Sequence, residues 1–431
     1  MSETRPASLM PLISSAETRK HEREQQHELL HTVKIASSEE EIKSGEGFYI
    51  APRLMPEAYP GDKPETTGFL VDAKDGLVTG ILWNSDSSLF VNQGDFNPVV
   101  ERSDPESPDG KSQVPLDEYL TGKGLTPLSE RYVLTAFGSN RCPGQLQHKF
   151  QKWIKDNEIS DESIANDLLT VPAFNGILKG YDVVYNSTLG NLGYAFGDLY
   201  AGPETQDTEI EVVNLFLTKE QMQVIHESEV EYQFAEIGEV RLGSLIYDDK
   251  YGFGDFKTVP AYAHIGTAEA YAITDEQGVK RPVAIGDIYG RNRNLTSMDQ
   301  SSFQDFHLGH DPTGKKTAAL RLAKVLVDLE VDDKDYIQSL DVENLPQDLS
   351  DSLAKETLEP TGQNYRDWIR MGGKAKKLAI RRLFKEIAKQ GTGEEERMII
   401  DPSSASKTTI ISRDPSDLPN WGEIGQSQTA A

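Results

Sequence analysis

The chain has 431 residues, and its 70 acidic against 44 basic residues give a formal net charge of -26. This length predicts about two or three domains, and the negative charge repels polyanions, so nucleic acid is not an expected partner. No apolar run approaches the roughly 20 residues that cross a bilayer, residues 1–20 lack the apolar core of a secretory signal, and the single cysteine, Cys142, excludes an internal disulfide. We therefore expect a soluble, cytoplasmic protein without a membrane partner.

The first two segments of the chain differ in texture. Residues 1–45 are polar and are expected to form a disordered head without a core. Residues 46–125 contain short apolar runs separated by Gly, Asp, Asn and Ser, which predicts a β-rich region. The predicted strands lie near 68–72, 77–83 and 89–91.

Residues 126–310 show a strand, a tight turn and a helix, followed by further strands. An apolar run over 131–137 ends at Gly138, Ser139 and Asn140, and Pro143 suits the first turn of the helix that follows. Thr218 is a suitable N-cap for a short amphipathic helix. Further strands are predicted near 181–185, 210–217 and 270–273.

Residues 311–390 are predicted to form a helical extension. Residues 328–359 hold 11 acidic and 2 basic residues, whereas residues 363–390 hold 9 basic and 2 acidic residues. These opposite charge blocks favour an intramolecular pairing, and the extension is a possible surface for a protein partner. Residues 391–431 are predicted to be a disordered tail, and both chain ends, 1–45 and 395–431, are expected to be protease-sensitive.

Two histidine pairs have the spacing of metal ligands. His27 and His31 match the H-E-x-x-H pattern of zinc hydrolases, but the residues before them are almost wholly polar and no third ligand follows, which favours an exposed helix. His307 and His310 are separated by a glycine and have no neighbouring carboxylate or cysteine to complete a four-coordinate site, which favours a loop. We predict no metal site, with zinc-dependent hydrolysis through His27 and His31 as a third alternative.

The basic segment 363–390 is a possible site for phosphate groups, because Lys and Arg clusters neutralise them. The acidic segment before it and the net negative charge favour a different interpretation. We expect a solvated helical face whose apolar residues pack on the body of the protein.

The strongest candidate site combines residues 137–140 with Glu229. A strand that ends in Gly138, Ser139 and Asn140 presents consecutive backbone N–H groups ahead of a helix, and such a loop suits a carboxylate or an oxyanion. The alternative is a turn with only a structural role. Glu227 and Glu231 compete with Glu229 for any acid–base role, because all three share a face in extended chain.

Residues 130–300 resemble the γ-glutamylcyclotransferase-like family. The resemblance depends on the aromatic-Gly-Ser-Asn loop at Phe137, Gly138, Ser139 and Asn140, on later strands and a Gly-Pro turn, and on a short helix that closes on Glu229. Phe137 replaces the tyrosine usual in that family, so no phenol hydrogen bond is expected there, whereas the backbone N–H groups remain. The resemblance implies an α+β fold with a mixed, closed β-barrel and helices, preceded by the β-rich region and followed by the helical extension.

The resemblance also implies a reaction, namely intramolecular aminolysis of a γ-glutamyl amine or peptide to 5-oxoproline and a free amine. The substrate is then a small γ-glutamyl or related amide, no cofactor is needed, residues 137–140 bind the substrate, and Glu229 is the general acid and base. That role requires Glu229 to be partly removed from water. The alternative is a non-catalytic binding or scaffolding protein that uses the same barrel.

Overall fold

The computed structural model describes most of the chain between residues 33 and 424. The described residues are 33–36, 41, 49–55, 58–64, 66–83, 98–103, 111–189, 194–230, 232–245, 257–266, 269–309, 315–331, 333–340, 344–357, 397–399 and 408–424. The predicted head, residues 1–45, lies almost wholly outside this set, as do the predicted strand at 89–91 and the basic segment 363–390.

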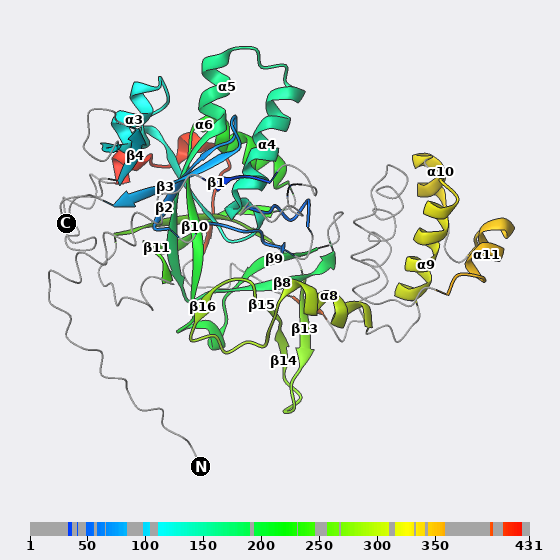
Figure 1. The fold of residues 1–431 in the computed structure, drawn as a ribbon. Helices are drawn as coiled ribbons and strands as arrows, with labels where there is room; N and C mark the ends of the chain where they lie inside the picture. The colour runs from blue at the N-terminus through cyan, green and yellow to red at the C-terminus, as the bar shows by residue number, and fades with distance from the viewer. Residues whose placement is uncertain are drawn as a thin grey trace.

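The larger of two sheets has twelve strands, and its described pairings are antiparallel, many of them between strands far apart along the chain (Figure 1). Its first part comes mainly from the predicted β-rich region and confirms the strands expected at 68–72 and 77–83. The elements in this part are β1 (Val33–Lys34), β2 (Gly68–Asp72), β3 (Leu77–Trp83), β4 (Pro98–Ser103), β5 (Lys111–Pro115) and α3 (Leu116–Gly122). The described end of the predicted head differs from its prediction, because β1 pairs with β3 and Ile35 is buried in a core.

The central strand of this sheet is β7, Thr170–Lys179. Its first half pairs with β2, with Gly68 opposite Phe174, so the β-rich region and the central region share one sheet across the predicted boundary at 125/126. On its other edge β7 pairs with β10 along most of its length. The remaining strands of this sheet are β6 (Tyr132–Ala136), β10 (Glu209–Leu217), β11 (Tyr232–Leu242), β12 (Thr258–Gly266), β16 (Gly290–Arg291) and β19 (Thr409–Ile410).

The α+β class is confirmed, but the prediction of a closed barrel is wrong for the residues that the structure describes. The path β6–β10–β7–β11–β12 curls until β12 lies next to β6, yet no ladder of hydrogen bonds joins these two described strands. Among the described residues, β6 pairs only with β10, and β12 pairs only with β11, so the two end strands of this path stay neighbours without backbone hydrogen bonds. The sheet also branches at β7, where one edge serves β2 and then β11.

The second sheet has seven strands and lies beside α8, Gln300–Gly309 (Figure 1). Its centre is β8, which confirms the strand expected at 181–185, and β13 covers the one expected at 270–273. Its strands are β8 (Asp182–Leu189), β9 (Ala195–Tyr200), β13 (Glu269–Thr274), β14 (Lys280–Pro282), β15 (Ala284–Ile285), β17 (Ser297–Met298) and β18 (Arg397–Ile399).

Strand β10 is buried on both faces because it separates two apolar cores. Ile210, Val212 and Phe216 point to one core, whereas Val213 and Leu215 point to the other, as expected for side chains that alternate along a strand. The second core is covered by the helices α4 (Pro143–Asp156), α5 (Glu162–Leu169) and α6 (Lys219–Ser228).

The starts of these helices follow from local sequence. Pro143 occupies the first turn of α4, where its missing N–H is not needed. The side chain of Asp161 accepts hydrogen bonds from the first N–H groups of α5. Thr218 and Gln221 form a reciprocal capping box at the start of α6, which confirms the predicted N-cap.

The predicted helical extension is present as α9 (Lys315–Asp328), α10 (Lys334–Ser339) and α11 (Gln347–Leu353), at the right of Figure 1. Two other places in the C-terminal part of the chain differ from their predictions. His307 lies inside α8 rather than in a loop, because its ring packs between Phe303 and Tyr271.

The predicted disordered tail is the second difference. Residues 408–424 lie against the body of the protein (red in Figure 1), where Ile411 and Leu418 join one core and Trp421 and Ile424 the other. The prediction failed here because a few apolar residues in a polar stretch are enough to anchor it when each is buried.

Candidate functional site

The loop after β6 adopts the conformation that its sequence suggested. Phe137 is buried, and residues Ser139–Arg141 form one 3₁₀ turn (η3) before α4 begins. The first N–H groups of a 3₁₀ turn, here those of Ser139 and Asn140, have no acceptor within the turn. A Cβ atom at Gly138 would lie 3.0 Å from the hydroxyl of Tyr59, so the glycine permits this close approach.

Glu229 follows the last turn of α6 and reaches the same loop. The Asn140 side chain donates a hydrogen bond from Nδ2 to Oε1 of Glu229 at 3.0 Å. The Glu229 side chain keeps only 16% of its surface exposed. The structure therefore brings the two halves of the predicted site into direct contact, although they are 89 residues apart in the sequence.

Lys149 of α4 joins Glu229 and Asn140 into one network. Its ammonium group donates to Glu229 Oε1, to Asn140 Oδ1 and to the hydroxyl of Ser228, each at 2.7 Å. Among the residues that the structure describes, none donates a hydrogen bond to the other carboxylate oxygen, Oε2. Oε1 of Glu229 is thus held in place, and Oε2 can accept a hydrogen bond from a ligand.

These groups line a cavity of about 430 Å³ between the ends of β6 and β12. Residues 134–140 form one side, His264 and Gly266 form another, and the exposed side chain of Val230 marks the mouth. One cavity therefore reaches both the loop and Glu229. A cavity of this size suits a small molecule.

Aromatic side chains form another wall of the cavity. The rings of Tyr59 and Tyr194 stack with their centroids 4.8 Å apart, and Phe196 packs edge-on against Tyr194. The Tyr59 hydroxyl accepts a hydrogen bond from the Gly197 N–H at 2.8 Å. Burial raises the pKa of both tyrosines, so both are neutral around pH 7.

A second carboxyl group, that of Asp198, lies beside the cavity. Asp198 is fully buried, and burial raises its pKa to about 6. It accepts a hydrogen bond at 2.7 Å from Asn186, whose side chain lines the cavity. Asp198 therefore fixes the orientation of an amide that faces the ligand.

A pair of histidines closes the wall behind Glu229. Nδ1 of His226 and Nε2 of His264 lie 2.8 Å apart, so one ring donates to the other. Burial lowers the pKa of His226 to about 4 and that of His264 to about 2, and the positive charge of Arg413 adds to both shifts. Both rings are therefore neutral around pH 7.

The residues just described divide into predicted and missed ones. The sequence pattern led to Phe137, Gly138, Ser139, Asn140 and Glu229, and the structure places all five at this cavity. Of the competing acids, Glu227 is exposed and bonds Gln223 instead, and Glu231 lies outside the described residues. Lys149, Tyr59, Tyr194 and His264 were missed because no local signal distinguishes them from ordinary surface or core residues.

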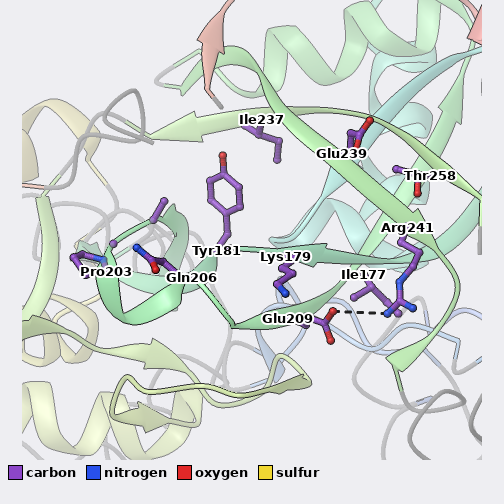
Figure 2. A pocket seen from close by; sticks show the side chains of 13 residues that line it. Ile177, Lys179, Tyr181, Pro203, Gln206, Glu209, Ile237, Glu239, Arg241 and Thr258 are labelled. Carbon is purple, nitrogen blue, oxygen red and sulfur yellow. Dashed lines mark ion pairs between the residues drawn. The ribbon is translucent and has the colours of Figure 1, made fainter. Parts of the chain in front are cut away.

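A second, larger cavity of about 680 Å³ lies among β7, β10 and β11, and Figure 2 shows its lining side chains. None of the predicted site residues lines it. Its carboxylate at Glu209 forms ion pairs with Arg241 at 3.8 Å and with Arg291 at 2.6 Å. Both oxygens of this carboxylate are thus engaged by guanidinium groups.

The remaining candidates contribute little. Among the described residues, no group of three or more His, Cys, Asp or Glu side chains is arranged to hold a metal ion. His27, His31 and His310 lie outside those residues. In the same part of the chain no helix is both long enough and apolar enough to span a bilayer.

No protein-family model, curated protein or solved structure matches this chain. The interpretation of the cavity therefore rests on its geometry and on the loop and glutamate that resemble the γ-glutamylcyclotransferase-like family.

Proposed function

We propose that the protein is a γ-glutamylcyclotransferase-like enzyme that converts a γ-glutamyl amine or peptide to 5-oxoproline and a free amine. The observation that carries the proposal is the hydrogen bond between Asn140 and Glu229, because it unites the loop and the acid of the motif in one cavity. The proposed substrate is a small γ-glutamyl amide, and no cofactor takes part.

The reaction closes a ring, and the protein contributes by bending the substrate and by stabilising the charge that develops. The α-amino nitrogen of the γ-glutamyl group attacks the γ-carbonyl carbon, a C–N bond forms within a five-membered ring, and the C–N bond to the departing amine breaks. A bent substrate makes the attack effectively unimolecular, which contributes a large part of the rate. The free N–H groups of Ser139 and Asn140 are suited to the negative charge that develops on the carbonyl oxygen.

Glu229 handles the proton in this scheme. Its carboxylate takes a proton from the attacking nitrogen and passes it to the departing nitrogen. A single group can serve both steps, since the two nitrogens are bonded to the same carbon. Lys149 and Asn140 donate hydrogen bonds to Oε1. The other oxygen, Oε2, receives none from the described residues and is available for this proton transfer.

The Lys149 contact also favours the second candidate, a binding module without turnover. An ammonium group 2.7 Å from the carboxylate offsets the negative charge that a proton acceptor needs. A cavity of this kind can bind a γ-glutamyl ligand without catalysing its cyclisation.

The experiment that separates the two is an assay of γ-glutamyl amines and peptides for released 5-oxoproline, together with calorimetric binding of the same compounds. Turnover that disappears in Glu229→Gln but persists in the matched variant Glu227→Gln supports the enzyme. Saturable binding without turnover supports the binding module. If no compound binds and none is turned over, both proposals are wrong.

A further inference from the structure

Residues 408–424, which we name the C-terminal strap, include a short segment, 413–416, that runs along α6 in the opposite direction. At the start of the helix, Lys219 donates to the hydroxyl of Ser416 at 2.6 Å. At its end, the guanidinium group of Arg413 contacts the turn that carries Glu229. The strap thus touches α6 at both ends, although Arg413 and Glu229 are 184 residues apart.

Arg413 contacts three backbone carbonyl groups of that turn. Its Nη1 donates to the carbonyl of His226 at 3.0 Å, and its Nη2 donates to the carbonyls of Glu229, at 2.9 Å, and Tyr232. The carbonyls at a helix end lack partners within the helix, and a cation there is favourable. The planar guanidinium group satisfies several of them at once, in a fixed geometry.

The turn itself has little regular structure to hold it. Glu229 lies at φ -115° and ψ 45°, outside helical and extended conformations. The turn is closed by backbone bonds from Glu229 N–H to His226 and from Tyr232 N–H to Glu229, at 3.3 and 3.1 Å. Arg413 binds the acceptors of both bonds, so its position fixes where the Glu229 backbone lies.

The strap is anchored well enough to hold Arg413 in place. Before Arg413, β19 pairs with β11, and the Ile411 N–H donates to the Phe234 carbonyl at 3.0 Å. After it, the buried ring of Trp421 packs edge-on against Phe216, and the backbone N–H of Trp421 donates to the Arg131 carbonyl at 2.8 Å. Arg413 is therefore fixed on both sides.

We propose that Arg413 is a positioning residue for Glu229 and that the C-terminal strap completes the candidate site. Arg413 does not reach the ligand, because it acts on the backbone of the turn from behind the cavity. Its loss allows the turn to move, and a displacement of about 1 Å at a reacting group costs about 100-fold in rate.

The test compares Arg413→Ala, Arg413→Lys and the matched control Arg281→Ala, which removes an arginine from an ion pair at the β13–β14 hairpin. We expect the rate constant kcat to fall about 10- to 100-fold in Arg413→Ala with KM changed less than about twofold. Arg413→Lys should recover part of the loss, and Arg281→Ala should behave as wild type.

The kinetic part rests on the proposed function, so a second measurement is made without substrate. Hydrogen exchange of the Glu229 and Tyr232 amides should be faster in Arg413→Ala, while the amides of β7 remain as protected as in wild type. If wild type turns over no γ-glutamyl compound, the proposed function fails and the exchange data decide on the strap. Unchanged exchange at both amides overturns the inference. If Arg413→Ala does not stay folded, Arg413→Lys decides by the same comparison.

Discussion

The two cavities of this protein differ in what surrounds their carboxylates. In the larger one, Glu209 faces two arginines at the charged rim of the sheet. In the smaller one, Glu229 is largely buried, bonds one ammonium and one amide through Oε1, and has a row of aromatic rings opposite. Volume alone would select the larger cavity, whereas the environment of the acid selects the smaller one.

The comparison shows that a carboxylate can act on a ligand only if one of its oxygens is not already occupied by cations of the protein. Glu209 is fully engaged in neutralising cations, which is a structural task. Glu229 is held at one oxygen, and no described residue donates to the other, a combination that fixes the group and leaves one oxygen for a ligand.

The largest difference between the cavities should appear when each carboxylate is replaced by its amide. We expect Glu229→Gln to lower turnover of a γ-glutamyl substrate by about two to four orders of magnitude, because the amide keeps the shape but transfers no proton. Glu209→Gln should change turnover by less than about twofold. Steady-state kinetics and calorimetric binding of both variants measure this, and equal losses would erase the distinction.

The histidine pair gives the Glu229 cavity a pH signature. The folded-state pKa values of His226 and His264 lie below the ordinary 6.5, so the unfolded chain binds protons more tightly at these groups. Their contribution to stability is therefore full above pH 6.5 and is lost as the pH falls. Between pH 6.5 and about 5 the loss at His264 is on the order of 2 kcal/mol.

Urea unfolding of wild type and His264→Asn across this pH range measures the effect. The asparagine retains a hydrogen-bonding group but does not titrate, so its stability should fall less steeply with acid. Asp198, whose raised pKa gives the opposite slope, is present in both proteins and cancels in the difference. Parallel curves for the two proteins would contradict the assignment of a neutral, buried pair.

A smaller effect is expected from Gly138→Val. The added side chain meets the Tyr59 hydroxyl, and overpacking of this kind costs about 1–3 kcal/mol. We expect ligand affinity to fall about tenfold while the circular dichroism spectrum is retained. The control is Gly122→Val at the end of α3, where an added Cβ has no neighbour within 4 Å. Equal affinity in wild type and Gly138→Val would show that the loop has only a structural role.

The smallest effect is expected two residues before Glu229. Glu227→Gln removes an exposed carboxylate that bonds only Gln223 among its described neighbours, so turnover and stability should both stay within about twofold and about 0.5 kcal/mol of wild type. Kinetics and urea unfolding measure both. Loss of turnover here, with Glu229→Gln active, would move the acid–base role to Glu227.

The sequence predicted local structure well and long-range closure poorly. The strand at 132–136, the turn at 138–140 and the helix from Pro143 follow from apolar periodicity and turn residues, and the structure has all three. The closed barrel did not follow, because closure requires β12 to pair with β6, and no local pattern shows whether two strands so far apart in the chain will pair.

The same limit applies to the site. The loop and Glu229 were found by their order along the chain, whereas Lys149 lies on a polar helix face that resembles any solvated one. Arg413 lies in a stretch whose composition predicts disorder, and contacts with distant parts of the chain, such as the β19–β11 pairing and the burial of Trp421, hold it in place. Contacts between residues this far apart leave no periodic trace in the sequence.

The strap also has a consequence for the order of events during synthesis. Chains emerge from the ribosome N-terminal part first, at about 5–20 residues per second, so β6, α6 and β12 are all available before residues 408–424 exist. The cavity can then form with its turn still loose, and Arg413 arrives last. On this basis the nascent protein holds its sheet for several seconds before its candidate active site is complete.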